Sequence, residues 1–340
     1  MDVVERSVTR PVRSAVVVNP VKVDDLDEFR ATVDGALTAA GWPAPRWYQT
    51  TSEEPGRSQT ADAVATGAEI VFVAGGDGTI LSAVSALMGT DTAMAVLPAG
   101  TGNLLAANLG LSTDVAAGLE VALEGGLRRL DVGEVDGQHF TVMAGMGFDA
   151  RMLDATSDTA KARFGWPAYI AGALRHVTDR RMNVTVRIDG GKPIRRKAQT
   201  VLVANVGRLQ GGVRLLTEAR PDDGLLDVAI LTPRLLRHWL ALGWAVVRRK
   251  ERVPSMEVYR GSRVEIASDR AQPRQLDGDL IEAGRLLDVQ VQPKALWMCV
   301  PLPADHPDLA EDADAAAERG HRLGETATTG QKATPAASNG

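Results

Sequence analysis

The chain has 340 residues, of which 44% are hydrophobic and 24% charged, as expected for a globular protein long enough for two domains. A formal net charge of -5 gives no sign of general nucleic-acid binding. The single cysteine, Cys299, excludes an intramolecular disulfide framework and a cysteine-rich zinc site. Residues 1–13 lack the apolar core of a signal peptide, and no apolar stretch reaches the roughly 20 residues that span a bilayer. We therefore expect a cytoplasmic protein.

The first part of the chain alternates apolar, β-branched runs with amphipathic segments. Strands are predicted at 14–18, 46–48, 71–74 and 93–97, and helices at 26–37, 61–65, 80–84, 104–108 and 115–124. This alternation indicates a largely parallel sheet, with ligands at the carboxyl ends of its strands. We therefore expect the loops that carry Asn19, Asp77 and Thr101 to face one crevice.

The pattern changes near Leu130 to short strands separated by turns. Asp136-Gly137 predicts a hairpin turn, and an interval at 166–177 is helical in pattern. Further strands are predicted at 184–188, 200–205, 226–231, 264–267, 286–291 and 296–300. The prediction is an α/β domain with a mostly parallel sheet at 14–130, a β-rich antiparallel sandwich at 131–302, and a disordered tail at 303–340, where large apolar residues are few.

Gly75-Gly76-Asp77-Gly78-Thr79 stands between an apolar strand and a predicted helix. Backbone N–H groups at a helix N-terminus bind anions, and glycine lets the anion approach the main chain, so the segment is typical of a phosphate cradle. An aspartate there would repel bare phosphate, and we expect it to act through a divalent cation or on a proton. A second glycine loop, Pro98–Asn103, follows the next strand. The alternative is a glycine-rich turn that binds nothing.

Several enzyme classes are excluded by missing motifs. The sequence has no Walker pattern, no Gly-x-Gly-x-x-Gly, no metal-binding histidine spacing and no Gly-x-Ser-x-Gly elbow. Two phosphate-type loops and scattered carboxylates remain. These fit phosphoryl transfer, which needs a nucleotide cradle, a cation and a group that accepts a proton.

The glycine loop, with Asn19-Pro20 before it and Pro98–Asn103 after it, resembles the diacylglycerol kinase catalytic family, which includes bacterial lipid kinases and the sphingosine and ceramide kinases. Gly-Gly-Asp-Gly-Thr alone is shared with NAD kinases and phosphofructokinases, so the ordered set of motifs carries the resemblance. It covers about Ser14 to Val300 and continues through Leu130–Gly133, Gly145–Ala150, Pro221–Asp227 and Leu276–Asp279.

The resemblance implies ATP and Mg²⁺ as cofactors, with Asp77 near the ATP-bound magnesium. It implies a proton acceptor at the third position of an Asp-Gly-Glu pattern, which is Asp279 here, with Asp277 as the nearest substitute. The alternative for Asp277-Gly278-Asp279 is an exposed turn. The nucleotide site would comprise Asn19, Pro20, Lys22, Thr51 (or Thr50), Gly75, Gly76, Asp77, Gly78, Thr79, Gly100, Thr101 and Asn103.

The chain departs from the family pattern at three places, one of which is Val21-Lys22-Val23 after Asn19-Pro20, where the family usually has a small Ser-Gly pair. Leu104 stands where the family often has an aspartate. Arg220 stands where some bacterial members have an acidic ligand of a structural magnesium, which would also use Asp223 and the carbonyl of Leu225. A guanidinium cannot bind a cation, which argues against that ion and leaves Arg220 as its replacement in a salt bridge.

Two further aspartates have open roles. Asp131 either joins a carboxylate network beneath Asp77 or is a polar residue at a strand end. Asp149 either contacts the substrate head group or caps a helix. Lys22 either neutralises phosphate, pairs with an aspartate or is a solvated lysine.

The sequence therefore predicts a kinase that transfers the γ-phosphoryl of ATP to a lipid hydroxyl, with diacylglycerol as the first choice and a sphingoid base or other lipid alcohol as the alternative. A catalytically silent nucleotide- or lipid-binding protein is the rival from another class. Residues 234–252 combine tryptophans with a basic end and fit either peripheral contact with the inner membrane face or a buried helix. The sequence leaves a homodimer open.

Overall fold

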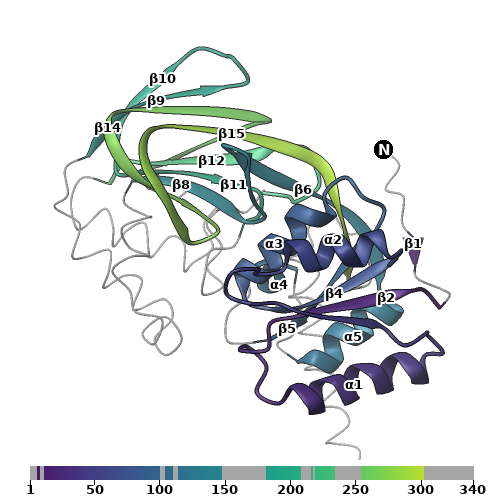
Figure 1. Ribbon diagram of the computed structural model, residues 1–340. Coiled ribbons are helices and arrows are strands. Elements are labelled where there is room, and N and C mark those ends of the chain that lie inside the picture. The colour runs from purple at the N-terminus through teal and green to yellow at the C-terminus, as the bar shows by residue number, and fades with distance from the viewer. Residues whose placement is uncertain are drawn as a thin grey trace, which may run out of the picture.

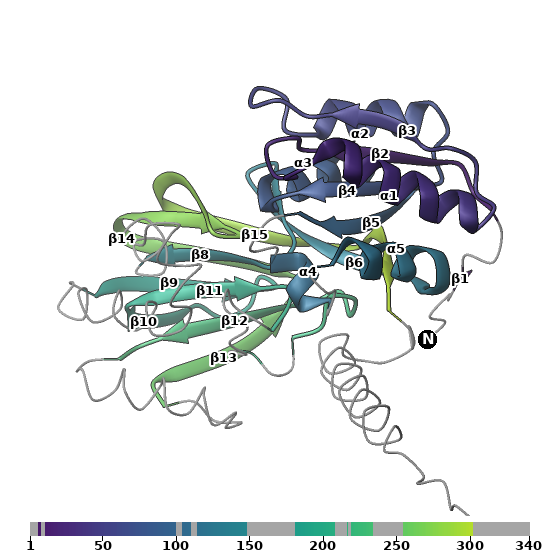
Figure 2. The same ribbon diagram turned by 90° about the horizontal axis from the view of Figure 1, so that it is seen from below.

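The computed structural model describes residues 6–7, 11–99, 104–109, 114–147, 181–207, 216, 219–233 and 254–301. Its strands form one 15-stranded sheet, whose main path runs β13-β12-β11-β8-β14-β15-β5-β4-β2-β3. Parallel strands with their helices occupy one side of the molecule and antiparallel strands the other, as Figure 2 shows. The predicted fold class is confirmed. No helix in the described ranges is long and apolar enough to cross a bilayer.

The α/β part contains four parallel strands and five helices. The strands are β2 (Ser14–Val18), β3 (Arg46–Gln49), β4 (Ile70–Gly75) and β5 (Ala93–Pro98). The helices are α1 (Leu26–Ala39), α2 (Arg57–Ala65), α3 (Asp77–Leu87), α4 (Leu104–Asn108) and α5 (Val115–Glu124). Asp25 caps α1 by accepting from the N–H groups of Asp27 and Glu28.

Side chains of β4 alternate between two apolar layers. Val71 and Val73 pack with α2 and α3, whereas Phe72 and Ala74 pack with α1 and α5 on the opposite face. The two pairs of helices therefore cover the two faces of the parallel strands (Figure 1). A strand covered on both faces is a near-continuous apolar run, and that is the pattern in the sequence.

The antiparallel part has its own core, which includes Phe140, Met146 and Val228. Its strands are β6 (Gly126–Val135), β7 (Gln138–Phe140), β8 (Met143–Gly147), β9 (Met182–Ile188), β10 (Ile194–Ala198), β11 (Thr200–Ala204), β12 (Leu226–Leu231), β13 (Met256–Gly261), β14 (Arg263–Leu276) and β15 (Asp279–Val300). A short strand, β1 (Arg6–Ser7), pairs with β6. The predicted turn at Asp136-Gly137 is present, with φ of 51° and 74°. Strands β10 and β13 were not predicted.

Strand β15 joins the two parts. Its first half, up to Gln290, pairs with β14, and its second half, from Val289 on, pairs with β6. At its end, Trp297 and Met298 also pair in parallel with β5. Two strands were predicted here, at 286–291 and 296–300. The structure has one strand with a register shift between Gln292 and Leu296. Because the 296–300 segment packs in the α/β core, β15 belongs to both parts, and the boundaries at 130 and 302 stay predictions.

Cys299 is buried in β15, and burial raises its pKa to about 12. The predicted helical interval at 166–177, the segment 234–252 and the tail at 303–340 lie outside the described residues.

Candidate active site

The carboxyl ends of β2 and β4 meet through Asn19. Its backbone N–H donates to the carbonyl of Ala74 at 2.8 Å, and its side-chain amide donates to the Thr79 hydroxyl at 3.4 Å. Its carbonyl and side-chain oxygens accept from the N–H groups of Lys22 and Val21, so Pro20 lies in a tight turn. The predicted meeting of these two loops is therefore present.

The glycine loop is built by close contact between Gly75 and Thr79. A Cβ atom on Gly75 would lie 2.6 Å from the Thr79 Cβ, so only glycine allows the chain to turn here into α3. Gly76 is the N-cap of α3 and offers no side-chain hydrogen bond to the first amides. The Lys22 Cε lies 3.8 Å from the position of a Gly76 Cβ. Uncapped amides and a nearby ammonium group suit an anion.

Asp77 occupies the first turn of α3, and its Oδ1 accepts a 2.8 Å hydrogen bond from the N–H of Leu104. Burial raises the pKa of Asp77 to about 6, the Leu104 amide opposes this shift, and the charges of Asp277 and Asp279 add to it. The Leu104 side chain packs with Val142 and Met143, whose N–H groups donate to Asp277, so the glycine loop meets the loop that holds Asp277 although 200 positions separate the two aspartates.

Asp277 and Gly278 form the two-residue turn between β14 and β15. Their φ values are 48° and 99°, and Leu276 pairs with Asp279 across the turn. This backbone favours Asp and Gly for a conformational reason. The motif is therefore a turn between strands, but not the exposed turn of the alternative interpretation, because Asp277 is buried.

The two aspartates of this turn have different surroundings. The Asp277 carboxylate accepts from the N–H groups of Thr141, Val142 and Met143, at 2.7, 2.9 and 2.8 Å, and from the Thr141 hydroxyl at 3.0 Å. It is 8% exposed; burial raises its pKa, and the amide bonds lower it. The Asp279 side chain is exposed and has no hydrogen-bond partner in the described part of the chain. Asp277 is thus fully engaged, whereas Asp279 is available to a ligand.

Thr50 and Thr51 directly follow β3, and Gly56 places Thr50 near the glycine loop. The Thr50 side chain is buried, and its hydroxyl has no partner among the described atoms. Gly56 lies between Thr50 and Thr79, since its Cβ position would be 3.6 Å from the Thr50 Cγ2 and 3.5 Å from the Thr79 carbonyl oxygen. Thr51 instead closes a turn with Glu54. Of the two predicted candidates, the geometry favours Thr50.

Four predicted site residues cannot be placed. Gly100, Thr101, Asn103 and Asp149 lie outside the described residues.

The predicted replacement of a structural magnesium by Arg220 is wrong, since Asp223 pairs with Arg260, and Arg220 is exposed. Asp223 also accepts from the Leu225 N–H. Asp131 lies in this region and not beneath Asp77, because its carboxylate accepts from the N–H groups of Gly224 and Lys294. In the described ranges, no three acidic, cysteine or histidine side chains are grouped to hold a metal ion. Asp223 and Leu225 therefore do not fit the structural magnesium that the resemblance implied.

Sequence reasoning missed Arg128 and Arg260, which hold the aspartates of this segment. Arg260 lies opposite Asp227 across β12 and β13, and Arg128 pairs with Asp222. No local pattern could identify them, because the paired residues are 33 and 94 positions apart.

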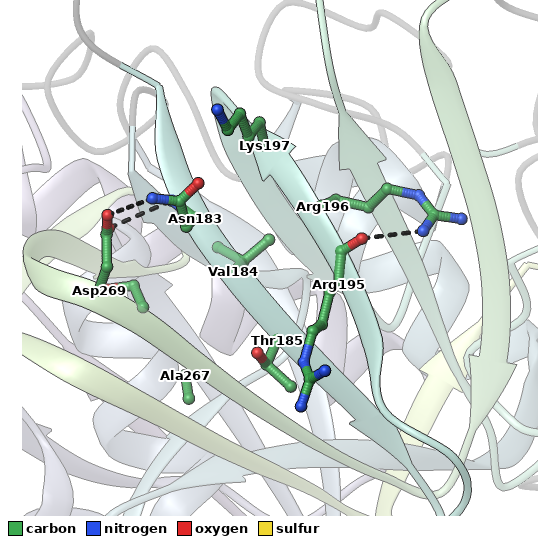
Figure 3. Close-up of a pocket in the computed structure, with 9 residues that line it drawn as sticks. Asn183, Val184, Thr185, Arg195, Arg196, Lys197, Ala267 and Asp269 are labelled. Atoms are coloured by element: carbon green, nitrogen blue, oxygen red, sulfur yellow. Dashed lines mark hydrogen bonds between the residues drawn. The ribbon is translucent and has the colours of Figure 1, made fainter.

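A surface hollow of about 510 Å³ lies on β9, β10 and β14, remote from these loops. Figure 3 shows Arg195 and Lys197 on one side of it and the Asn183–Asp269 pair on the other. It contains none of the predicted site residues. The candidate active site is therefore the meeting point of the glycine loop with the β14–β15 turn.

Both halves of the chain match known protein families. Residues 13–135 match the diacylglycerol kinase catalytic domain, and residues 142–300 match the YegS C-terminal NAD kinase beta sandwich-like domain. A Pseudomonas aeruginosa protein named probable lipid kinase YegS-like is 32% identical over 300 residues, which cover 84% of this chain and 93% of that protein. A Mycobacterium tuberculosis diacylglycerol kinase is 30% identical over 185 residues, 51% of this chain and 58% of that protein.

Solved structures share the fold at low identity. A diacylglycerol kinase from Bacillus anthracis superposes with a TM-score of 0.66 at 18% identity and covers 86% of this chain and 98% of its own. Yeast NADH kinase reaches a TM-score of 0.51 at 13% identity, over 87% of this chain and 86% of its own. The chain belongs to the diacylglycerol kinase catalytic family and groups with the YegS-like lipid kinases.

Proposed function

We propose that this lipid kinase transfers the γ-phosphoryl of ATP to the hydroxyl of diacylglycerol and so forms phosphatidic acid. The observation that carries the proposal is the meeting of the glycine loop with the β14–β15 turn: the Leu104 N–H donates to Asp77, and the Leu104 side chain packs with Val142 and Met143, whose N–H groups hold Asp277. Transfer to an alcohol needs phosphate-binding amides on one side and a proton acceptor on the other. The glycine loop would supply the phosphate-binding amides, and the β14–β15 turn would supply the proton acceptor.

The nucleotide phosphates would bind at the amides that begin α3. The uncapped helix end, the Asn19–Thr79 hydrogen bond and the nearby Lys22 support this assignment. The unpartnered hydroxyl of buried Thr50 lies beside the same loop and would gain a hydrogen bond from a bound nucleotide. We include Gly100, Thr101 and Asn103 in this site on the basis of the family pattern, and Asp149 as a contact of the substrate.

The residues present fit a Mg²⁺ ion that arrives with ATP. Asp77 is partly buried, and two further carboxylates raise its pKa, so a hard divalent cation would relieve an unfavourable concentration of negative charge. Bound there, Mg²⁺ would offset the charge of the phosphates during transfer. Asp77 is the residue that would hold it through the nucleotide.

Asp279 would accept the proton of the substrate hydroxyl. Its exposed carboxylate has no partner in the described ranges, whereas every Asp277 contact described above is to a fixed amide or hydroxyl. Asp277 would act as a positioning residue that holds the β14–β15 turn. Contact with the inner membrane face would bring the enzyme to its lipid, and we keep this as part of the proposal.

The test is transfer of labelled phosphate from ATP in the presence of Mg²⁺. Acceptors are diacylglycerol, sphingosine and ceramide in mixed micelles, and soluble NAD. Asp279→Asn should reduce transfer to diacylglycerol on the order of 10²- to 10⁴-fold without loss of nucleotide binding. Glu282→Gln, which changes an exposed carboxylate on the same hairpin, is the matched control and should retain activity.

The other outcomes are equally specific. Transfer to sphingosine or ceramide alone would assign a different lipid alcohol. Transfer to no acceptor, with ATP binding intact, would favour a silent binding protein. Full activity of Asp279→Asn would remove Asp279 as the proton acceptor.

A further inference from the structure

A segment between the two halves, Pro221–Asp227, contains three aspartates and is held by arginines. We call it the acidic loop. Arg128 donates to Asp222 through Nε at 2.9 Å and Nη2 at 2.5 Å. Arg260 donates through Nη2 to Asp223 and through Nε to Asp227, the latter at 3.3 Å. Arg128 therefore pairs with Asp222, and Arg260 pairs with both Asp223 and Asp227.

The acidic loop is attached to the two strands that pass between the halves of the molecule. Asp131 of β6 accepts from the Gly224 N–H at 2.6 Å and from the Lys294 N–H of β15 at 2.7 Å, and its own N–H donates to the Pro221 carbonyl at 2.6 Å. Its neighbours Leu130 and Val132 pack in the core of the parallel strands. Movement of the acidic loop would therefore disturb the junction that sets how the halves face each other.

The guanidinium of Arg260 pairs with the carboxylates of Asp223 and Asp227. The Asp227 side chain is 2% exposed and Asp223 is 20% exposed, and both face the guanidinium. Two carboxylates so close together require a positive charge between them. A divalent ion would have to displace Arg260, and a guanidinium has no lone pair with which to share it.

We propose that Arg260 is a built-in replacement for a divalent cation at the acidic loop, so that the stability of this junction does not depend on free Mg²⁺ or Ca²⁺. Arg128 reinforces the arrangement from β6 by fixing Asp222. The proposal concerns the chain without nucleotide and is independent of the proposed reaction.

Thermal unfolding of the full chain without nucleotide tests it. The wild type is compared after chelation with EDTA and in millimolar Mg²⁺ or Ca²⁺. In Arg260→Gln, Asp223 and Asp227 lose the guanidinium that pairs with both of them, and we expect Tm to fall by roughly 3–8 °C. Millimolar Mg²⁺ should restore about half of the lost Tm in this variant, by binding between the two carboxylates. The Tm of the wild type should not rise.

The matched control is Arg196→Gln, because Arg196 of β10 forms an arginine–carboxylate pair with Glu257 of β13 at 2.7 Å, but at the surface. It should lower Tm by about 2 °C or less and add no cation dependence. If Arg260→Gln does not fold, the double variant Arg260→Gln with Asp223→Asn removes one charge of the pair and should recover a folded protein.

Two results would overturn the proposal. One is a Mg²⁺-dependent rise in wild-type Tm that Asp223→Asn abolishes, since a metal would then bind beside Arg260. The other is an Arg260→Gln variant whose Tm and cation response match those of Arg196→Gln.

Discussion

Leu104 and Asp77 are joined by a hydrogen bond of 2.8 Å from the Leu104 N–H to the Asp77 carboxylate. The Leu104 side chain is 8% exposed and packs with Val142, Met143 and Leu202 of the antiparallel half. One residue therefore connects the glycine loop to the antiparallel half, through its backbone and its side chain. The apolar residue at this position is part of the junction between the halves.

We predict that Leu104→Asp destabilises the protein by about 3 kcal/mol, because it places a carboxylate in an apolar cluster next to Asp77. The measurement is unfolding in urea at pH 7. Leu104→Met, which conserves volume, should cost less than about 1.5 kcal/mol. Equal stability of the two variants would contradict the packing role.

The second prediction concerns pH. The pKa of Asp77 is raised from 3.8 to about 6 in the folded protein. Between these values the folded state binds the proton more tightly than the unfolded state, so stability rises as pH falls from about 6 to about 4. Above pH 6 the charged carboxylate costs the folded protein about 3 kcal/mol, an order-of-magnitude figure from the two-unit shift.

Asp77→Asn should therefore raise the free energy of unfolding at pH 7 to 8 and flatten its pH dependence, while the amide oxygen still accepts from Leu104. Burial also raises the pKa of Asp131 to about 6. The Asp131→Asn variant measures how much Asp131 contributes to the pH dependence of stability. In the wild type, kinase activity should decline below about pH 6, because the ionised form of Asp77 is the one that suits Mg²⁺. A stability curve unchanged by Asp77→Asn would argue against the raised pKa.

The third prediction separates the two aspartates of the β14–β15 turn. Asp277→Ala removes the acceptor of three amides and a hydroxyl and should cost about 3 kcal/mol or more in unfolding free energy. Asp279→Ala should change stability by less than about 0.5 kcal/mol, because its side chain is exposed. Chemical denaturation of both variants, alongside their transfer rates, checks this division. A stable Asp277→Ala with lost activity would instead favour a direct chemical role.

The fourth prediction concerns the glycine loop. Gly75→Ala should displace the Thr79 side chain, weaken its hydrogen bond to Asn19 and lower unfolding free energy by about 1–3 kcal/mol. Gly78→Ala is the control: a Cβ there meets nothing within 4 Å, and helix propensity favours alanine by about 0.5–1 kcal/mol. Thermal unfolding without nucleotide measures both. If Gly78→Ala is the less stable variant, the steric interpretation is wrong.

Much of the fold follows from local sequence signals. The strand predicted at 71–74 is β4, and the turn predicted at Asp136-Gly137 is present, because each depends on neighbours a few positions away. Strands β10 and β13 lack such a signal: their exposed side chains hide the alternation that marks a half-buried strand.

The candidate site divides in the same way. Glycines and polar residues at predicted strand ends indicated the glycine loop and Asn19, and the resemblance to the family indicated the Asp277-Gly278-Asp279 turn. Which aspartate is engaged and which is available depended on three amides near residue 142, about 135 positions away. The partner of Asp223 proved to be Arg260 and not the nearby Arg220, because pairing of β12 with β13 decides which charge the acidic loop meets. Local chemistry determined the elements and the motif, and long-range strand pairing decided the role of each carboxylate.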